Sequence, residues 1–422
     1  MPQTTIFDEL ESQVRSYCRN WPVVLATAAG SVVTDENGTE YLDFFAGAGV
    51  MNYGHNHPDL TEPLIDYLRS GAIVHSLDMH TAAKREFLES FREYVLTPRD
   101  LDYRVMFPGP TGTNSVESAL KLARKVTGRQ HILSFTNAFH GMTLGSLSVT
   151  GNAMKRQGAG VPLTNTSTMP YDQYLSGVAD DFQWLERVLA DSGSGVDLPA
   201  AIIVETVQGE GGLNAARPEW LRALQDLCRR YDILLIVDDV QAGVGRTGTY
   251  FSFEESGIVP DIVCLSKALS GYGLPMALTL IRPDLDQWEP GEHNGTFRGH
   301  NPAFVTGAAA LKRFWADDTF QNEVQARAAE LREGLEKIAS GYPDAVVKGR
   351  GLLAGIEFPD KAAATRIAAE SFRRGLLVET SGPDSEVLKA MPPLTITSQE
   401  LQRGLGIIAD AAAEVLGDQT VA

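Results

Sequence analysis

A lysine that follows a predicted buried strand is the residue of this chain best suited to covalent chemistry. Lys267 comes directly after the apolar run Asp261–Leu265 and shortly before the Gly-rich segment Ser270–Pro275. Most lysines are solvated surface charges, but a lysine held at such a place is partly desolvated, which lowers the pKa of its ammonium. A lysine of this kind can form a Schiff base with a carbonyl compound. The position of Lys267 therefore predicts a reactive amine.

Two adjacent acids follow another apolar strand. The run Ile233–Val237 leads into Asp238 and Asp239, which could form a metal site, cap a helix, or supply one acid that protonates a ligand nitrogen. Side chains alternate along a strand, so Asp238 and Val240 face one way and Asp239 faces the other. This geometry makes a poor bidentate metal site, and it favours a single functional acid, Asp238.

A Gly-rich loop opens the first long helix of this region. Gly112 and Thr113 precede the helical pattern of Ser115–Thr127, and backbone N–H groups at such a helix start suit a phosphate. The same residues could simply form a tight turn with a helix cap. An anchored phosphate, an acid on a ring nitrogen and a Schiff-base lysine are together the requirements of pyridoxal phosphate. Their joint order along the chain predicts that cofactor.

A second glycine motif is only weak evidence for a dinucleotide-binding site. Residues 243–248 match the pattern GxGxxG, which in dinucleotide-binding proteins opens a helix. Here the motif leads into the aromatic segment Tyr250–Phe253 instead of an amphipathic helix. The missing helix disfavours NAD binding.

The elements that must position these residues form an α/β pattern. Short apolar runs alternate with helical patterns between residues 104 and 281, which predicts a mostly parallel sheet covered by helices. Longer helices, such as Ala303–Trp315 and Phe320–Ala339, follow and indicate a smaller α/β domain. The hairpin pattern around Asn37-Gly38 belongs to an N-terminal segment. We expect residues 1–50 to join the small domain, residues 51–305 to form the large cofactor-binding domain, and residues 306–422 to form the small domain.

Composition excludes several classes of protein. The 422 residues contain 36 Lys+Arg and 54 Asp+Glu, giving a formal charge of −18. An acidic chain without a basic run does not favour nucleic acids or anionic membranes. The three cysteines show no metal or disulfide spacing, and His55 and His57 lack further ligands, so we predict no metal site. The start of the chain has no leader pattern and no run could span a bilayer, so we expect a cytoplasmic protein.

Beyond these local features, nearly the whole chain resembles the class III aminotransferases, enzymes of fold type I that use pyridoxal 5′-phosphate. The resemblance implies a large domain with a mostly parallel seven-stranded sheet and a smaller α/β domain. It rests on motifs spread along the sequence, namely Tyr53–Pro58, Gly112–Lys121, Phe139–Gly141, Glu205 with Gln208–Gly212, Asp238–Gln241, Ser266-Lys267, Gly295–Phe297 and Pro392–Leu394.

The resemblance implies a role for each matched residue around the cofactor. Lys267 would form the Schiff base and move the proton, and Asp238 would keep the ring nitrogen protonated. The other expected contacts are Phe139 and Val240 on the two ring faces, Gln241 on the phenolic oxygen, Gly112 and Thr113 on the phosphate, and His140 and Glu205 around the pocket. Thr296 would reach the phosphate of a neighbouring subunit, so the active unit would be at least a homodimer.

The substrates implied by the resemblance are an amino donor and 2-oxoglutarate. The overall likeness favours transfer of the terminal amino group of L-2,4-diaminobutyrate in a ping-pong reaction of ectoine synthesis. An omega-amino-acid transaminase of the GABA or ornithine type and a same-fold aminomutase stay open as alternatives. Many relatives hold a substrate carboxylate with an arginine, whereas the matching position here is Lys389, and Glu210 would pair with it. A second departure is Asp239, where the family usually has a glutamate.

Overall fold

A seven-stranded sheet forms the centre of the larger part of the molecule. The computed structural model describes residues 5–175 and 181–417. The strand order is β4-β12-β11-β10-β7-β5-β6, and β12 alone among them runs antiparallel to its neighbours. The strands are β4 (Arg104–Met106), β5 (Ile132–Phe135), β6 (Thr166–Met169), β7 (Ala201–Val204), β10 (Leu234–Asp238), β11 (Ile262–Leu265) and β12 (Leu278–Ile281). The predicted fold class, including a mostly parallel seven-stranded sheet, is confirmed.

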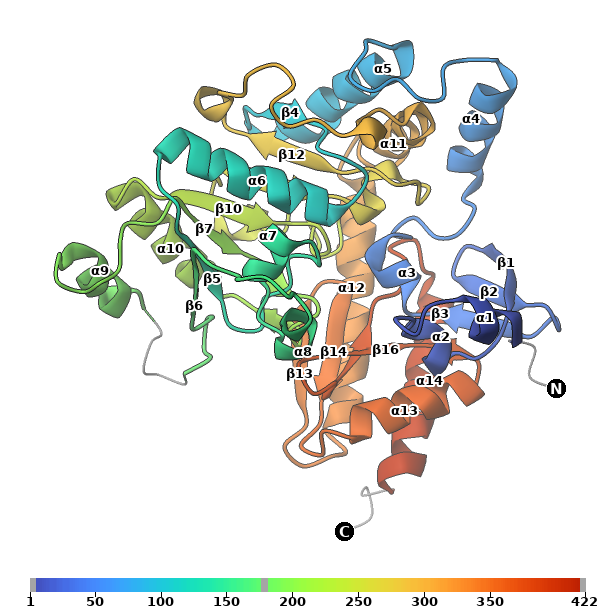
Figure 1. Ribbon diagram of the computed structural model, residues 1–422. Helices are drawn as coiled ribbons and strands as arrows, with labels where there is room; N and C mark the ends of the chain where they lie inside the picture. The colour runs from blue at the N-terminus through green and yellow to red at the C-terminus, as the bar shows by residue number, and fades with distance from the viewer. Residues whose placement is uncertain (1–4, 176–180, 418–422) are drawn as a thin grey trace.

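Alternating side chains of the buried strands pack against helices on the two faces of this sheet. Ile203 and Ile236 belong to one hydrophobic cluster with residues of α6 (Gly112–Thr127). Leu235 belongs to the other, larger cluster with residues of α10 (Pro218–Arg230). The strands are therefore apolar on both faces, as parallel strands between helices must be. Figure 1 shows α6 lying across the sheet.

The C-terminal part of the chain forms a second sheet and long helices. The sheet has the order β13-β14-β17-β16, and its strands are β13 (Val346–Arg350), β14 (Leu353–Glu357), β17 (Val387–Ala390) and β16 (Glu379–Ser381). The helices of this part are α12 (Thr319–Ala339), α13 (Ala363–Arg373) and α14 (Ser398–Leu416). In Figure 1 the long helix α12 runs beside β13 and β14 towards α13 and α14.

The N-terminal strands join the C-terminal part through a small sheet. The strands β1 (Leu25–Ala29), β2 (Val32–Asp35) and β3 (Glu40–Asp43) form an antiparallel meander. The strand β15 (Leu376–Leu377) pairs in parallel with β3. The assignment of residues 1–50 to the small domain and the domain boundary at residue 305 stay predictions. The two ends of the predicted domains, residues 1–4 and 418–422, lie outside the described residues.

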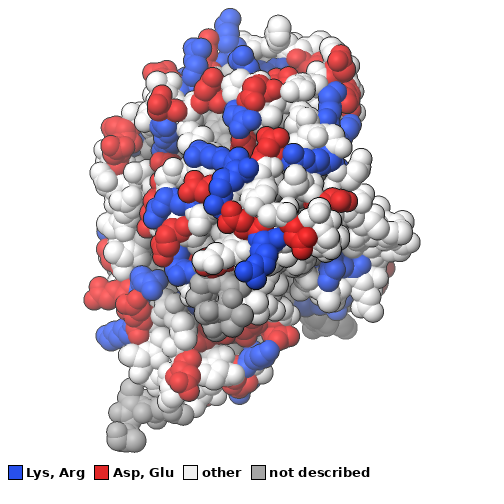
Figure 2. Space-filling model, turned by 90° about the vertical axis from the view of Figure 1, so that its left-hand side faces the viewer, with Lys and Arg blue, Asp and Glu red and all other residues white. Residues whose placement is uncertain are grey.

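The remaining elements connect these sheets. The helices are α1 (Thr5–Leu10), α2 (Tyr17–Asn20), α3 (Ala46–Gly49), α4 (Pro58–Arg69), α5 (Ala82–Phe91), α7 (Leu144–Ser148), α8 (Ala153–Gln157), α9 (Gln183–Ala190) and α11 (Asn301–Phe314), and a short hairpin joins β8 (Val207–Gln208) to β9 (Asn214–Ala215). Within the described ranges, no helix is both long enough and apolar enough to cross a bilayer. On the face seen in Figure 2, Lys and Arg side chains are interspersed with Asp and Glu.

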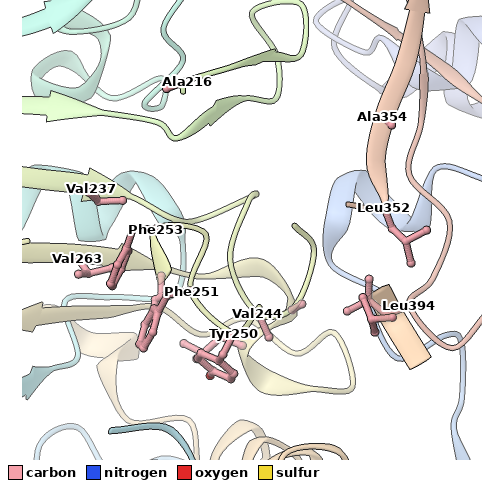
Figure 3. Close-up of a cluster of buried hydrophobic side chains, with 14 of the residues drawn as sticks. Ala216, Val237, Val244, Tyr250, Phe251, Phe253, Val263, Leu352, Ala354 and Leu394 are labelled. Carbon is pink, nitrogen blue, oxygen red and sulfur yellow. The ribbon is translucent and has the colours of Figure 1, made fainter. Parts of the chain in front are cut away.

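The GxGxxG segment after β10 packs where the two parts of the molecule meet. The Arg246 side chain is fully buried and donates hydrogen bonds to the carbonyl oxygens of Leu352 and Pro392. A Cβ on Gly245 would lie 2.8 Å from Leu394, so glycine is required for this close approach. Figure 3 shows Leu394 and Leu352 in the same hydrophobic cluster as Tyr250 and Val244. The motif thus joins the two parts and does not open a helix.

Candidate active site

A cavity of about 530 Å³ lies beyond the carboxyl ends of the parallel strands. This edge is where open α/β sheets bind ligands. The cavity is lined by ten of the predicted site residues, namely Gly112, Thr113, Phe139, His140, Glu205, Glu210, Asp238, Val240, Gln241 and Lys267. Loops that are far apart in the sequence therefore meet around one space, since the strands that precede them are neighbours in the sheet.

The start of α6 forms one wall of the cavity. Thr111 and Asn114 close a capping box around the first turn, and the predicted helix start at Ser115 moves back to Gly112. A Cβ on Gly112 would lie 2.8 Å from the Val240 side chain, so the backbone can approach the cavity only without one. The first N–H groups of a helix have no partner within the helix. The backbone N–H groups of Gly112 and Thr113, at the start of α6, therefore suit an anion.

The Thr113 hydroxyl is fixed by a neighbouring loop. Its Oγ1 lies 2.6 Å from Thr143 Oγ1 and 2.9 Å from Ser146 Oγ. Glu117, one turn further along α6, accepts a hydrogen bond from the Thr143 hydroxyl at 2.6 Å. A Cβ on Gly141 would lie 2.5 Å from Thr113 Oγ1, so the loop packs tightly over the helix start. The start of α6 is therefore held in place by the loop that contains Gly141, Thr143 and Ser146.

Asp238 and His140 form a buried pair at the base of the cavity. Asp238 Oδ2 lies 2.7 Å from His140 Nδ1, and Asp238 is only 6% exposed. Burial alone would lower the pKa of His140, but the hydrogen bond and charge of Asp238 raise it above the ordinary value. A protonated imidazole can only donate to the carboxylate. The pair therefore presents an oriented carboxylate to the cavity.

Glu205 is a second buried acid beside this pair. Its Oε2 accepts a hydrogen bond from the Phe139 N–H at 2.9 Å, which fixes the loop that carries Phe139. Burial raises the pKa of Glu205 to about 8, although the charge of His140 opposes the shift. Glu205 thus supports the Phe139 loop and belongs to the charge network of His140.

Lys267 adopts a strained backbone conformation where β11 ends. Its φ is +52°, in the left-handed region that residues other than glycine rarely occupy. Burial lowers the pKa of its ammonium from 10.5 to about 8. Strain of this kind persists only where the surrounding structure enforces it, and it is common at active sites. The structure therefore places an amine of lowered pKa at the cavity wall.

Lys389 lies behind the cavity wall between two glutamates. Its Nζ is 3.0 Å from Glu210 Oε1 and 3.0 Å from Glu379 Oε1, and the side chain is fully buried. Burial alone would raise the pKa of Glu210, but the charge of Lys389 lowers it to about 2. Gln241 Oε1 also accepts from Lys389 at 3.2 Å. Glu210 and Gln241 line the cavity, whereas Lys389 does not.

Sequence reasoning missed Glu379 and Tyr17 in this cluster. Glu379 is the direct cross-strand partner of Lys389 in the antiparallel pairing of β16 with β17. Burial and the charges of Glu379 and Glu210 raise the pKa of the Tyr17 phenol, which places α2 near the same acids. Neither residue belongs to a recognisable motif. A signal was available only for Glu379, an acid that directly follows the apolar stretch Leu376–Val378.

Asp239 turns away from the cavity and does not line it. Its Oδ2 accepts a hydrogen bond from the Ser252 N–H at 3.0 Å, and burial raises its pKa to about 7. His55 pairs with Asp43 at 2.7 Å, and His57 caps α4. Among residues 5–175 and 181–417, no group of three or more His, Cys, Asp or Glu side chains is arranged to hold a metal.

Thr296 lies apart from the cavity of its own chain. It begins a short 3₁₀ helix, is exposed, and its carbonyl oxygen is 2.6 Å from His75 Nε2. The segments around His75 and His300 form an isolated antiparallel bridge that brings residues 73–79 beside 296–299. Thr296 is not among the residues that line the cavity of its own chain, and its predicted contact with a phosphate stays a prediction.

Comparisons with known proteins agree with this arrangement. Residues 15–412 match the family "Aminotransferase class-III". A diaminobutyrate–2-oxoglutarate transaminase from Streptomyces anulatus is 62% identical over 98% of both chains. A protein of the same name from Halalkalibacterium halodurans is 58% identical over 97% of both chains.

Solved structures with the same fold include enzymes of related activity. The ornithine aminotransferase from Toxoplasma gondii has a TM-score of 0.83 at 27% identity, with 98% of this chain and 94% of that chain covered. An amine transaminase from an uncultivated Pseudomonas species, solved with bound pyridoxal phosphate, has a TM-score of 0.84 at 26% identity. That comparison covers 96% of this chain and 98% of the other.

Proposed function

The chain belongs to the class III aminotransferases, and we propose that it transfers the terminal amino group of L-2,4-diaminobutyrate to 2-oxoglutarate. The products are L-aspartate 4-semialdehyde and L-glutamate, and the reaction serves ectoine synthesis. The observation that carries this proposal is the 62% identity, over 98% of both chains, to a relative named for this reaction. The cavity supports it, because Lys267, Asp238 and a helix N-terminus all line one space.

The residues of the cavity fit pyridoxal 5′-phosphate, the cofactor of this family. When bound, the cofactor withdraws electrons from the reacting carbon of the substrate and carries the amino group between two half-reactions. The first N–H groups of α6 would hold its phosphate, since a helix N-terminus favours an anion and Gly112 and Thr113 line the cavity. Phe139 and Val240 would enclose its ring, and Gln241 would donate a hydrogen bond to its phenolic oxygen.

Asp238 and Lys267 then perform the acid and base work. The Asp238 carboxylate, oriented by His140, would accept a hydrogen bond from the protonated ring nitrogen, and its negative charge would keep that nitrogen protonated. Lys267 removes and returns the proton at the reacting carbon of the substrate. Its lowered pKa of about 8 suits this role, because a proton shuttle works best when its pKa lies near the working pH.

We further propose that Glu210 and Lys389 respond to the charge of the substrate. In the amine half-reaction, the reacting CH₂ group carries no carboxylate, and Glu210 stays paired with Lys389. Glutamate brings a carboxylate to the reacting carbon, which competes for Lys389 and displaces Glu210. Glu379 keeps Lys389 paired in both states, so the buried ammonium is never left alone.

Single-turnover absorbance measurements test this switch. We expect Lys389→Ala to slow the 2-oxoglutarate half-reaction far more than the diaminobutyrate half-reaction. Glu210→Gln should do the reverse, since Lys389 would then keep only Glu379 as a charged partner when the substrate has no carboxylate at its reacting carbon. Equal losses in both half-reactions would contradict the switch.

An assay of acceptor dependence separates the proposed reaction from its alternatives. A transaminase turns over only when a keto acid is supplied, whereas an aminomutase cycles without one. A panel of amine donors with 2-oxoglutarate then distinguishes diaminobutyrate from ornithine and GABA. We expect turnover that requires 2-oxoglutarate and a specificity constant highest for diaminobutyrate. Turnover without any keto acid would overturn the proposal.

We also propose that the active unit is at least a homodimer in the cytoplasm. Large apolar side chains are exposed on the two adjoining segments near Thr296, including Ile73 at 57% and Phe297 at 66%. Apolar surface of this kind is typical of an interface between subunits. The three cysteines Cys18, Cys228 and Cys264 are free, which suits a reducing compartment.

A further inference from the structure

Glu117 connects α6 to the loop that covers the start of this helix. Its Oε1 accepts two hydrogen bonds from that loop, one from the Thr143 hydroxyl at 2.6 Å and one from the Ser146 N–H at 3.1 Å. A Cβ on Gly145 would lie 2.1 Å from Glu117 Oε2, so a side chain at position 145 would displace this carboxylate. In Figure 1, α7 lies beside α6. Glu117 therefore ties α7 to α6.

Glu117 also takes over a task that ordinarily belongs to Thr143. Thr143 is the N-cap residue of α7, and a threonine hydroxyl at that position commonly accepts a hydrogen bond from the N–H of the second or third helical residue. The third residue is Ser146, and its N–H donates to Glu117 instead. Within this fully described helix, Thr143 makes no capping bond with its side chain. Its hydroxyl is therefore available for contacts outside α7.

The contact with Glu117 fixes the direction of a chain of hydroxyl groups. A carboxylate accepts hydrogen bonds and donates none, so the Thr143 hydroxyl donates to Glu117. Thr143 Oγ1 also lies 2.6 Å from Thr113 Oγ1, and two oxygens at this distance need a hydrogen between them. Because the single hydrogen of the Thr143 hydroxyl is already used, Thr113 supplies it. The hydrogen of the Thr113 hydroxyl therefore points to the loop.

This arrangement separates two tasks at the start of α6. Thr113 lines the cavity, whereas Thr143 and Ser146, whose hydroxyls are both within 2.9 Å of Thr113 Oγ1, do not. The hydroxyl of Thr113 thus sets the position of this residue against the loop. The groups left to bind an anion are the backbone N–H groups of Gly112 and Thr113, because the first N–H groups of a helix have no partner within it.

We propose that Glu117 is a positioning residue for the phosphate of the cofactor. By holding Thr143 and Ser146, it directs the Thr113 hydroxyl to the loop. The phosphate is then bound by backbone N–H groups and receives no hydrogen bond from that hydroxyl. The Glu117 carboxylate does not line the cavity and acts only through Thr113. The inference rests on the proposed contact between the phosphate and the start of α6, and not on the identity of the substrates.

The first test measures the affinity of the cofactor-free enzyme for pyridoxal 5′-phosphate by fluorescence titration. Glu117→Leu removes the acceptor of both hydrogen bonds and should lower this affinity by about tenfold to a hundredfold. Glu117→Gln keeps an oxygen that can accept both, so its affinity should stay within about threefold of the wild type. Glu323, an exposed acid of α12, supplies the control, and Glu323→Leu should bind the cofactor as the wild type does.

Pyridoxal, which lacks the phosphate, makes the first test specific to that group. Its affinity should change by less than about threefold in Glu117→Leu, because Glu205 separately holds the loop that carries Phe139. Equal losses for the two ligands would overturn the inference, since Glu117 would then support the whole pocket. A wild type that binds pyridoxal as tightly as pyridoxal 5′-phosphate would contradict the proposed phosphate contact itself.

The second test does not depend on the folding of Glu117→Leu. It compares the cofactor affinities of Thr113→Val, Thr143→Val and the double variant. If the Thr113 hydroxyl donates only to the loop, both single variants break the same hydrogen bond, and the double variant should lose little more affinity than either one. A hydroxyl that donates to the phosphate would make Thr113→Val much weaker than Thr143→Val. Additive losses, or a loss confined to Thr113→Val, would overturn the inference.

Discussion

At the scale of single residues, burial decides what each charged group can do. Lys267 and Lys389 are both lysines at the same site, yet their surroundings give them opposite properties. Burial lowers the pKa of Lys267 to about 8, whereas Glu210 and Glu379 raise the pKa of Lys389 above its ordinary value. Lys267 can therefore be a neutral amine near neutral pH, whereas Lys389 stays a cation.

The first prediction concerns the pH dependence of cofactor attachment to Lys267. Only the neutral amine attacks a carbonyl group, so its fraction grows about tenfold per pH unit below the pKa. With a pKa of about 8, the attachment rate of the cofactor-free enzyme should rise up to pH 8 and then level off. Stopped-flow absorbance measures this rate. A rise that continues towards pH 10 would mean that burial does not shift the pKa of Lys267.

A matched variant serves as the control for this prediction. Lys267→Ala should lose transaminase activity by several orders of magnitude, because the lysine supplies both the covalent link and the proton transfer. After borohydride reduction, mass spectrometry should find the cofactor on the peptide with Lys267 in the wild type. A reducible adduct with full turnover in Lys267→Ala would show that another residue holds the cofactor.

At the scale of elements, the carboxyl ends of the strands position most of the predicted site residues. The sequence was sufficient to predict β10 and β11 and the residues that follow them, because apolar runs and alternation are local properties. The contact between Lys389 and Glu379 depends on the register of β16 against β17, which no local pattern specifies. For the same reason the proximity of Lys155 to Phe139 could not be predicted, since a loop and a short helix bring them together.

The second prediction tests the alternation of side chains along β10. Asp238→Asn should lower kcat by at least about a hundredfold while cofactor affinity falls much less, because the lost charge mainly affects the ring nitrogen. Asp239→Asn should change kcat little, since its carboxylate accepts a hydrogen bond from Ser252 and does not line the cavity. Steady-state kinetics and cofactor titration give both values. Similar kcat values for the two variants would contradict the assignment of Asp238.

At the scale of the whole molecule, the active site depends on parts that come from both ends of the chain. Glu379 and Lys389 belong to the C-terminal sheet, and Tyr17 belongs to the N-terminal segment. Composition and periodicity indicated two α/β parts. They did not predict that Arg246, which lies in a motif resembling a nucleotide-binding loop, donates hydrogen bonds to the carbonyl oxygens of Leu352 and Pro392. Only the tertiary structure reveals that this arginine joins the two parts.

The third prediction concerns the subunit interface. Phe297 is 66% exposed in a single chain and packs against the His75 ring, and Ile73 and Met79 are exposed on the same segment as His75. If this surface packs against a second copy, Phe297→Asp buries a charge and should convert dimers to monomers with a large loss of activity. Light scattering measures the mass. The exposed residue Met154 supplies a control, and Met154→Asp should leave the dimer intact. A fully dimeric Phe297→Asp enzyme would place the interface elsewhere.

In the proposed reaction, the terminal nitrogen of diaminobutyrate passes through this cavity to 2-oxoglutarate. Its most direct test uses diaminobutyrate labelled with heavy nitrogen only at the terminal amine, incubated with the cofactor-loaded enzyme and 2-oxoglutarate. Mass spectrometry of the products should find the label in glutamate, with unlabelled nitrogen retained in the semialdehyde product. Glutamate that carries no label would show that the other amine reacts, and it would contradict this account.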